Sequence, residues 1–232
     1  MKDRWDLFQE KFTLSQKRIK IVQCKSSNLN YQLIRNRHYV ANHGCIGQQV
    51  HYLIYLEHKI IGIISGASAV YAVKARDVFF GLNKDNKKIA LNSIINNVVF
   101  RLECHKKNLG TQILSMWRKQ IAIDWELRYR VKVHGFETFV IEQENRKGAM
   151  YKADNWFFLG ETAGSAKLLG KKIDGGESRN RRIKTNKKLI FAIKIPKTKL
   201  CSEYKGKSAW KINNLSGNLF KYFKFNKNDK KS

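Results

Sequence analysis

Proline, paired cysteines and long apolar runs are all scarce in this chain of 232 residues. The only proline is Pro196, and we expect it to end the last strand. The cysteines show no CxxC spacing, which excludes a disulfide framework and is typical of reduced thiols in the cytoplasm. The N-terminal MKDRWDLFQEKF has no apolar core of a secretory signal, and no apolar run approaches the roughly 20 residues of a membrane helix. We therefore expect a cytoplasmic protein that makes no contact with a membrane.

Acidic residues are also few: 18 Asp and Glu stand against 46 Lys and Arg, a formal net charge of +28. Residues 167–232 hold 20 of the basic and only four of the acidic residues. Such an excess favours a polyanionic partner, here nucleic acid. The other interpretation is the Lys-rich and Asn-rich composition of a low-GC genome. Charge alone does not separate DNA from RNA, nor an enzyme from a DNA-binding protein without catalytic activity.

The length suits one domain, or one domain with an extension. A hydrophobic fraction of 43% and an aromatic fraction of 12% suffice for a packed core in residues 1–196. Residues 197–232 form a basic C-terminal extension, in which lysines alternate with aromatic side chains. Cations contact phosphates and aromatic rings stack on extruded bases. The alternative is an amphipathic extension that packs on the domain.

Hydrophobic patterning predicts an α/β protein. Strands are expected at residues 20–24, 50–56, 59–64, 93–102, 136–141 and 189–195. Helices are expected at residues 1–16, at 29–36 with Leu29, Leu33 and Ile34 facing inward, from residue 109 onward, and at 149–156. Residues 26–28 (SSN) offer N-cap side chains for the helix at 29–36. Apolar residues recur every fourth position in the helix that starts near 109, which marks its buried stripe.

The segment before that helix indicates an anion site. A strand leads through HKKNLGT (residues 105–111) into the helix start, whose backbone N–H groups favour anions. GNAT acyltransferases hold the pyrophosphate of coenzyme A with this geometry, on a loop of pattern Q/R-x-x-G-x-G/A. Here the loop has one glycine, Gly110, which departs from that pattern. Gly110 and Thr111 are the candidate donor-binding residues.

Polar and aromatic residues are densest in residues 135–164. Glu137 lies on a mostly apolar face of its strand, as either a general base with a raised pKa or the partner of an arginine, perhaps Arg101. The pair His38 and Tyr39 either borders a site or merely ends a helix. Arg101 is the one charge in an apolar run, so it must be paired or face a cleft.

Basic residues in two loops are the candidate DNA contacts, and we expect residues 164–188 to form a loop over phosphates. The candidates are Arg146, Lys147, Arg179, Arg181 and Arg182.

The order of short motifs resembles the DruA family of Druantia anti-phage systems and the related Mom-like DNA-modification proteins. The matching segments are RDVFFG (76–81), NNVVFR (96–101), NLGT (108–111), DWELRY (124–129), ETFV (137–140), GAMYKADNW (148–156) and GETAG (160–164). They cover roughly residues 30–196 in the family's order, and His38-Tyr39 fits the family's H-Y pair.

The resemblance implies a GNAT-like mixed sheet flanked by helices, and a transferase that adds a small acyl or carbamoylmethyl-type group to adenine N6 in double-stranded DNA. It also implies iron(II), with His38 as the candidate ligand, and a small-molecule donor. The role would lie in phage–host conflict, as anti-restriction or defence. The residues that matter in Mom-like proteins correspond here to His38, Tyr39, Arg101, Thr111, Glu142 and Tyr151.

Two departures concern the catalytic residues. The family's aspartate after ETFV is replaced by Ile141, which leaves Glu142 as the candidate substitute. The family's N-N-x-R-F order is shifted to NNVVFR, which affects the assignment of Arg101.

Adenine N6 is a weak nucleophile, so attack needs a base and a group that stabilises charge. We expect Glu142 or Glu137 as base, Arg101 as charge stabiliser, and Tyr39 and Tyr151 as positioning or relay groups. The base must flip out of the duplex, and Asn155 and Trp156 are candidates to read and stack on it. Trp156 fits a place in the core equally well. The alternative is a DNA-binding component of a defence system that has no catalytic activity.

Overall fold

The computed structural model describes residues 19–39, 47–143, 146–167 and 182–202. The expected helix at residues 1–16 and nearly all of the basic C-terminal extension lie outside these residues. The division at residue 196 therefore stays a prediction.

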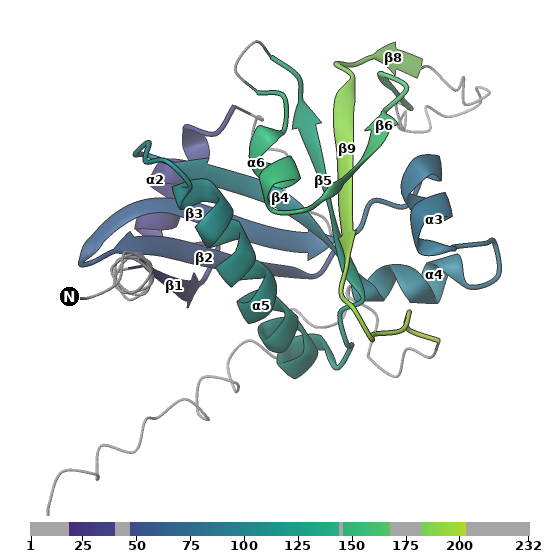
Figure 1. The fold of residues 1–232 in the computed structure, drawn as a ribbon, viewed down its shortest axis with the longest axis horizontal. Coiled ribbons are helices and arrows are strands. Elements are labelled where there is room, and N and C mark those ends of the chain that lie inside the picture. The colour runs from purple at the N-terminus through teal and green to yellow at the C-terminus, as the bar shows by residue number, and fades with distance from the viewer. Residues whose placement is uncertain (1–18, 40–46, 144–145, 168–181, 203–232) are drawn as a thin grey trace, which may run out of the picture.

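A mixed sheet organises the described part of the chain (Figure 1). Its seven strands lie in the order β1-β2-β3-β4-β5-β9-β6, and a separate two-stranded ribbon pairs β7 with β8. Within the large sheet only β4 and β5 pair in parallel; every other described pair is antiparallel. The strands are β1 (Ile19–Cys24), β2 (Gln49–Leu56), β3 (Lys59–Ser68), β4 (Ile94–Leu102), β5 (Gly135–Ile141), β6 (Phe157–Glu161), β7 (Ser165–Lys167), β8 (Arg182–Lys184) and β9 (Lys188–Lys194). The expected α/β class and mixed central sheet flanked by helices are confirmed.

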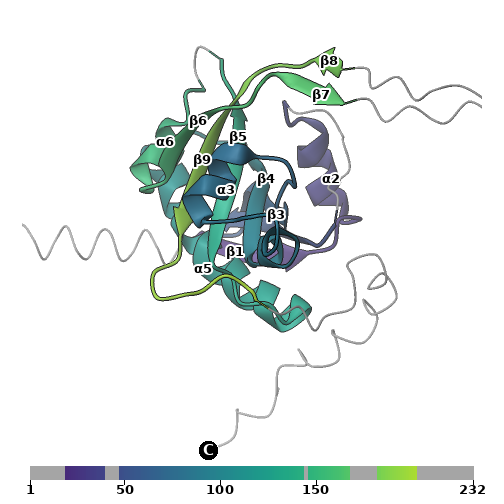
Figure 2. The ribbon, with the colours of Figure 1, turned by 90° about the vertical axis from the view of Figure 1, so that its right-hand side faces the viewer.

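Helices cover both faces of the sheet. The helices are α2 (Leu29–Asn36), α3 (Lys74–Phe80), α4 (Lys87–Ala90), the 3-10 turn η1 (Leu91–Ser93), α5 (Leu109–Tyr129) and α6 (Ala149–Ala153). Figure 2 shows α5 and α6 on one side of the sheet and α2 on the opposite side. The crossover from β4 through α5 to β5 is the connection that a parallel neighbour requires.

The main core lies between the sheet and α5. The predicted stripe of α5 is confirmed, because its members are buried: Leu109, Ile113, Trp117, Ile121 and Trp125. They pack against alternate residues of β2 and β3, such as Tyr52 and Ile64, in one cluster. A buried Leu or Trp of this kind contributes about 1.5–3 kcal/mol, so α5 is the main support of the sheet.

The predicted inward face of α2 is partly wrong. Its bounds and its Asn28 N-cap, whose Oδ1 accepts from the Tyr31 N–H at 3.1 Å, agree with the sequence prediction. However, Leu29 and Leu33 are 68% and 54% exposed, and the buried residues are Tyr31 and Ile34. The reason is polar: the Tyr31 hydroxyl lies 2.8 Å from Ser65 Oγ on β3, and this contact fixes the rotation of the short helix.

Candidate active site

Strands β4 and β5 pair over only four residues each. Ile94 to Asn97 of β4 face Gly135 to Thr138 of β5. Beyond that point β4 continues beside β3 and β5 continues beside β9, so the two halves of the sheet diverge (Figure 1). Backbone groups and side chains at such a divergence are not covered by a neighbouring strand, which makes it the natural place for a site.

A buried polar cluster lies where the strands part. Tyr151, from α6, donates its hydroxyl to Asn97 Oδ1 at 2.8 Å. Thr138 donates its hydroxyl to the Asn97 carbonyl at 3.0 Å, and its oxygen lies 3.4 Å from the Tyr151 hydroxyl. All three residues are less than 9% exposed. The cluster therefore joins β4, β5 and α6 at the end of the parallel pairing.

A β-bulge in β4 explains the hydrogen bonds of the Asn97 side-chain amide. Ser65 pairs with Val99 and Gly66 with Asn97, so Val98 is an extra residue in β4. A bulge interrupts the ladder, and the Asn97 side chain supplies hydrogen bonds there: its Nδ2 donates to the Ser65 carbonyl at 3.1 Å and to the Val99 carbonyl at 3.3 Å. With its Nδ2 engaged on both carbonyls, Asn97 holds Oδ1 toward Tyr151.

The hydrogen bonds continue to the far side of the sheet. Ser65 Oγ lies 3.0 Å from His51 Nδ1, and the centroids of the Tyr31 and His51 rings are 4.9 Å apart, with the rings tilted to each other by 55°. Burial, followed by the positive charges of Arg128 and Arg35, lowers the pKa of His51 to about 4. His51 is therefore neutral at pH 7 and serves as a fixed hydrogen-bonding partner.

Tyr39 and Arg146 form the outer part of the site. The Arg146 guanidinium lies 4.0 Å from the centroid of the Tyr39 ring, a close cation–π contact. Burial raises the pKa of Tyr39, opposed by the Arg146 charge and by a hydrogen bond from the backbone of Ile141 at the end of β5. Burial also raises the pKa of Tyr151, and the nearby Tyr39 adds to this rise. Both phenols are protonated at neutral pH and can donate hydrogen bonds or a proton.

The loop that carries Arg146 is held by its backbone. Gln143 and Arg146 form an isolated antiparallel bridge, with the Arg146 N–H donating to the Gln143 carbonyl at 2.8 Å. Gly148 then has φ +70°, and a Cβ there would lie 2.3 Å from the Phe191 ring. Only glycine fits that position, so α6 begins at a fixed point after the turn.

The other side of α6 is tied to α5. Arg118 donates to both carboxylate oxygens of Asp154, at 2.8 and 2.9 Å. Trp156 donates its indole N–H to the same carboxylate at 2.8 Å and is 4% exposed. The prediction that Trp156 stacks on a base is therefore wrong, because the ring is part of the core. Asn155 is exposed with φ +61°, a turn conformation that asparagine tolerates well, and it makes no recorded contact with the cluster.

Glu137 is removed from the site by a buried ion pair. It is fully buried and accepts a hydrogen bond from Arg76 Nη1, while its Oε1 accepts from the Val70 N–H at 2.8 Å. Burial raises the pKa of Glu137 to about 7, against the opposing effects of Arg76 and of the Val70 N–H. The ion-pair interpretation is correct, but the partner is Arg76 instead of Arg101. The predicted rise in the pKa of Glu137 is confirmed, whereas its role as general base stays a prediction; the described contacts of its carboxylate are with Arg76 and the Val70 N–H, not with the cluster.

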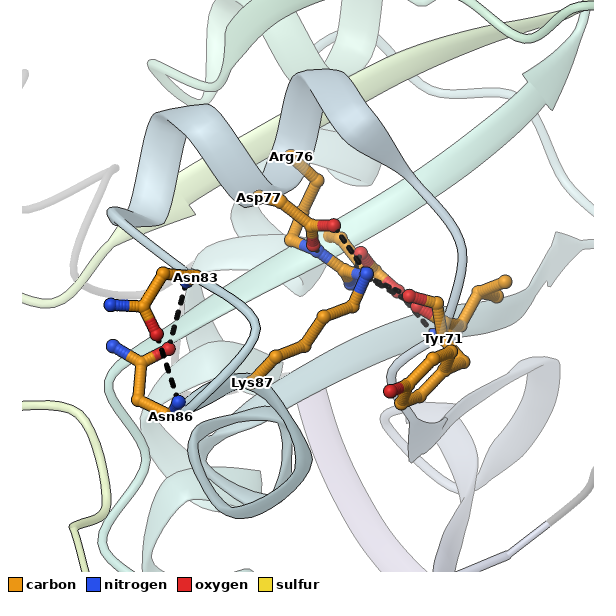
Figure 3. Close-up of polar contacts among 8 residues, drawn as sticks. Tyr71, Arg76, Asp77, Asn83, Asn86 and Lys87 are labelled. Atoms are coloured by element: carbon orange, nitrogen blue, oxygen red, sulfur yellow. Dashed lines mark hydrogen bonds and ion pairs between the residues drawn. The ribbon is translucent and has the colours of Figure 1, made fainter.

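Figure 3 shows the network around Arg76. Asp77 accepts from Arg76 Nε at 2.8 Å and from Lys87 Nζ at 2.5 Å, and Lys87 also lies 4.7 Å from the Tyr71 ring. Arg76 Nη2 donates to the Val70 carbonyl. Nearby, Asn83 and Asn86 each accept the other's backbone N–H, which closes the turn before α4 (Figure 3). The RD motif therefore fastens the segment after β3 and the helices α3 and α4 to β5.

Arg101 and His38 lie away from the cluster. Arg101 pairs with Glu103 at 2.6 Å and donates to the Arg37 carbonyl, at the end of α2. His38 is buried, with its ring 4.6 Å from the Tyr39 ring. Arg101 therefore links β4 to the end of α2. Its recorded contacts do not include Glu137 or Tyr151. Of the pair His38-Tyr39, it is Tyr39 that contacts the site.

The remaining predicted residues lie at the start of α5, on the loop after β5, or outside the described residues. Gly110 packs closely under α6, since a Cβ there would lie 2.6 Å from Met150 Sδ. The N-cap of α5 makes no side-chain capping bond, and Thr111 lies in the first turn of the helix. Glu142 and Lys147 are exposed on the loop after β5. Arg179 and Arg181 lie outside the described residues, and Arg182 opens β8, with its side chain likewise outside them.

The described residues do not offer an iron site. No three His, Cys, Asp or Glu side chains in the described ranges lie close enough to share a metal ion. His38, the predicted ligand, has an aromatic ring as its recorded neighbour. No step below passes through iron. In the same ranges no helix is both long and apolar enough to cross a membrane.

Sequence reasoning missed the two residues that hold Tyr151. Asn97 and Thr138 are the central partners of the cluster, and both lie in motifs that the sequence shows, NNVVFR and ETFV. The signal available was a pair of asparagines in an apolar strand, since buried amides need partners. Arg76, in RDVFFG, was equally visible and was not recognised as the partner of Glu137.

Comparisons with known proteins agree with this picture at the level of family and fold. The family model of the Druantia protein DruA matches residues 5–172. No curated protein matches the chain significantly.

Among solved structures, the chain is similar to the microcin C7 self-immunity acetyltransferase MccE in complex with acetyl-CoA and AMP. The identity is 13%, over 63% of this chain and 61% of MccE, with a TM-score of 0.36. It is also similar to NAA60 of Arabidopsis thaliana in complex with a bisubstrate analogue (12% identity, 78% and 99% coverage, TM-score 0.48). A third is the N-acetyltransferase PseH of Campylobacter jejuni (8%, 76% and 98%, TM-score 0.39). Values this low carry no information on the donor or acceptor of this chain.

The matched range contains the motifs that build the site and its supports, such as NNVVFR and ETFV. It covers residues 5–172 of 232 and so more than half of the sequence. The chain therefore belongs to the DruA family of Druantia proteins.

Proposed function

We propose that this chain is a transferase that adds a small acyl-type group to a base of double-stranded DNA, with adenine N6 as the acceptor, in phage–host conflict. The observation that carries the proposal is the Tyr151 hydroxyl, held by Asn97 where β4 and β5 part. The net charge of +28 supports a DNA partner, because each neutralised phosphate releases counterions. The DruA family membership supports the link to defence.

The chemistry asks for two proton transfers. As the new N–C bond forms at N6, the bond between the transferred group and its leaving group breaks, and the leaving group takes the bonding electrons. Tyr151, protonated at neutral pH, would supply the proton to that leaving group. Glu142, on the loop directly after β5, would accept the N6 proton. The proton that N6 loses to Glu142 is balanced by the proton that the leaving group gains from Tyr151. Glu142 then releases its proton to water, and Tyr151 regains its proton from water.

The donor is expected at the start of α5. Gly110 and Thr111 lie in the first turn of the helix, beside α6, and free N–H groups of that turn favour a charged or polarised donor group. The base would reach the cluster only after flipping out of the duplex. Tyr39, next to Arg146, would contact it on the outer side.

Mass spectrometry of nucleosides from cells that express the chain tests the proposal. We expect a new adenine species with the wild type and none with Tyr151→Phe or Glu142→Gln. The matched control is Tyr129→Phe, because the Tyr129 hydroxyl is equally bonded, to the Gln49 backbone at 2.8 and 2.9 Å, but serves only the fold. Full modification by both site variants would refute the site.

The second candidate is a DNA-binding component of a defence system that has no catalytic activity. One observation favours it: within the described residues no carboxylate contacts the cluster, since Glu137 is paired with Arg76. This candidate predicts salt-dependent DNA binding without any new nucleoside. A modified nucleoside that depends on Tyr151 would exclude it.

A further inference from the structure

Arg146 differs from the other well-ordered arginines of the sheet region in its partners. Arg76, Arg101 and Arg118 each pair with a carboxylate. Among the described residues Arg146 has no carboxylate partner; its guanidinium lies over the Tyr39 ring, and its Nη1 is buried without a hydrogen-bond acceptor. Arg76, Arg101 and Arg118 are thus each paired with a carboxylate. Among the described residues, Nη1 of Arg146, beside the site, has no hydrogen-bond acceptor.

An unpaired donor of this kind is costly in a folded protein. Leaving a buried N–H of a charged group without an acceptor lowers stability. Such a group in a native protein needs an explanation, and a bound anion is one. The position is also fixed, because Arg146 lies in the closed turn with Gln143 and two residues before Gly148, which no other residue can replace. The guanidinium is therefore held in place ahead of binding.

The neighbouring groups select an anion. Guanidinium recognises carboxylate and phosphate groups with paired N–H donors. Burial raises the pKa of Tyr39, so its phenol is protonated at neutral pH and can donate a hydrogen bond to an anion. Arg146 adds positive charge and N–H donors 4.0 Å from the Tyr39 ring, a combination that favours an anion over a cation.

We propose that Arg146 and Tyr39 form a subsite for one carboxylate or phosphate group of a molecule that reaches the Asn97–Thr138–Tyr151 cluster. The inference rests on the proposed function for the identity of that molecule, which is either the small-molecule donor or the DNA backbone beside the flipped base. The chemistry of recognition is the same in both cases: two or more N–H donors and one phenol on an oxyanion.

The test compares Arg146→Gln with Lys147→Gln, which removes a neighbouring exposed charge, in the full 232-residue chain. Affinities for sodium acetate, sodium phosphate and a short DNA duplex are measured at fixed ionic strength. Binding of the two anions is followed by the NMR resonances of labelled tyrosine rings. We expect Arg146→Gln to weaken acetate or phosphate binding, or duplex binding, by about tenfold, since hydrogen bonds to charged groups are the strong ones. Lys147→Gln should leave the anion affinities unchanged.

The two sources of the anion are separable. If it is a DNA phosphate, Arg146→Gln lowers duplex affinity and reduces the slope of log K against log salt by about one. If it belongs to the donor, duplex affinity stays constant while acetate or phosphate binding is lost. Either result supports the subsite. Unchanged affinity for all three probes, or an equal loss of acetate and phosphate affinity with Lys147→Gln, overturns it.

Folding does not obscure these results. Removal of an unpaired donor should leave the unfolding midpoint at or above that of the wild type, whereas a structural arginine would lower it. Arg146→Lys is the second variant: it keeps the charge but loses the paired donors. Its anion affinity should therefore lie between those of the wild type and Arg146→Gln. A wild type that produces no modified nucleoside would refute the proposed function but would leave these binding measurements decisive for the subsite.

Discussion

Arg76→Met should destabilise the protein in a manner that depends strongly on pH. The substitution keeps a long apolar stem and removes the guanidinium that pairs with Glu137, Asp77 and the Val70 carbonyl. Removing one partner of a buried pair typically costs about 3–5 kcal/mol. For a chain of this size that cost lowers the melting temperature by about 10 °C.

The pH dependence follows from Glu137. Its pKa is already raised to about 7 in the fold, and without Arg76 it rises further. A carboxyl whose folded pKa exceeds the unfolded value contributes stability at low pH and loses it as pH rises. At about pH 5 both proteins carry a protonated Glu137, and the penalty reflects lost hydrogen bonds alone. Between about pH 7 and pH 8 the penalty should grow by up to 1.4 kcal/mol, the value of about one pKa unit.

Urea unfolding at several pH values measures this. Arg101→Met is the control: Arg101 is 31% exposed in an ion pair with Glu103, so its loss should cost no more than about 1 kcal/mol. The double variant Arg76→Met with Glu137→Gln should remove the pH dependence. A penalty for Arg76→Met that is constant from low to high pH would refute the reasoning, because Arg76 would then not balance the buried carboxylate.

Three further predictions concern separate parts of the fold. Glu137→Gln should retain the yield of modified nucleoside per folded molecule, because the residue supports β5 and does not touch the cluster; loss of yield with normal folding would restore it as a base. The contribution of His51 to stability should rise with pH between about 4 and 6.5, because its depressed pKa favours the neutral form in the fold; in urea unfolding, the stability change of His51→Gln over this range should therefore differ from that of the wild type by up to about 3 kcal/mol. Gly148→Ala should unfold at a much lower temperature than Gly81→Ala, since both have positive φ but only Gly148 faces a ring within 2.3 Å; equal melting temperatures would contradict the packing argument.

The elements of this fold were predictable because their patterns are local. Alternation marks β2, β3 and β5, and a four-residue repeat marks α5, so each period indicates its structure directly. The asparagine that caps α2 was equally readable. The inward face of α2 was not, because the rotation of a short helix depends on one contact, from Tyr31 to Ser65, between residues 34 apart.

The site was harder to predict because its partners are distant in sequence. Of the residues that the sequence selected, Tyr39 and Arg146 lie in contact, and Tyr39 lies near Tyr151. It assigned Glu137 to Arg101, whereas the pairing of Glu137 with Arg76 depends on how the segment after β3 returns to β5. Strand alternation shows which face a side chain occupies, but the partner on that face comes from tertiary structure.

Two buried polar networks support the point at which β4 and β5 separate. On one face, Arg76 and Glu137 join the segment after β3 to β5; on the other, Tyr151 joins α6 to Asn97 of β4. Asn96 pairs with Glu137 and Asn97 with Thr138, the last two pairs before the strands separate. Each system therefore fixes the angle at which the halves of the sheet open. The proposed transfer needs that angle to be constant, since small displacements of reacting groups cost large factors in rate. The dense motifs of this chain are thus explained by support of the site as much as by its chemistry.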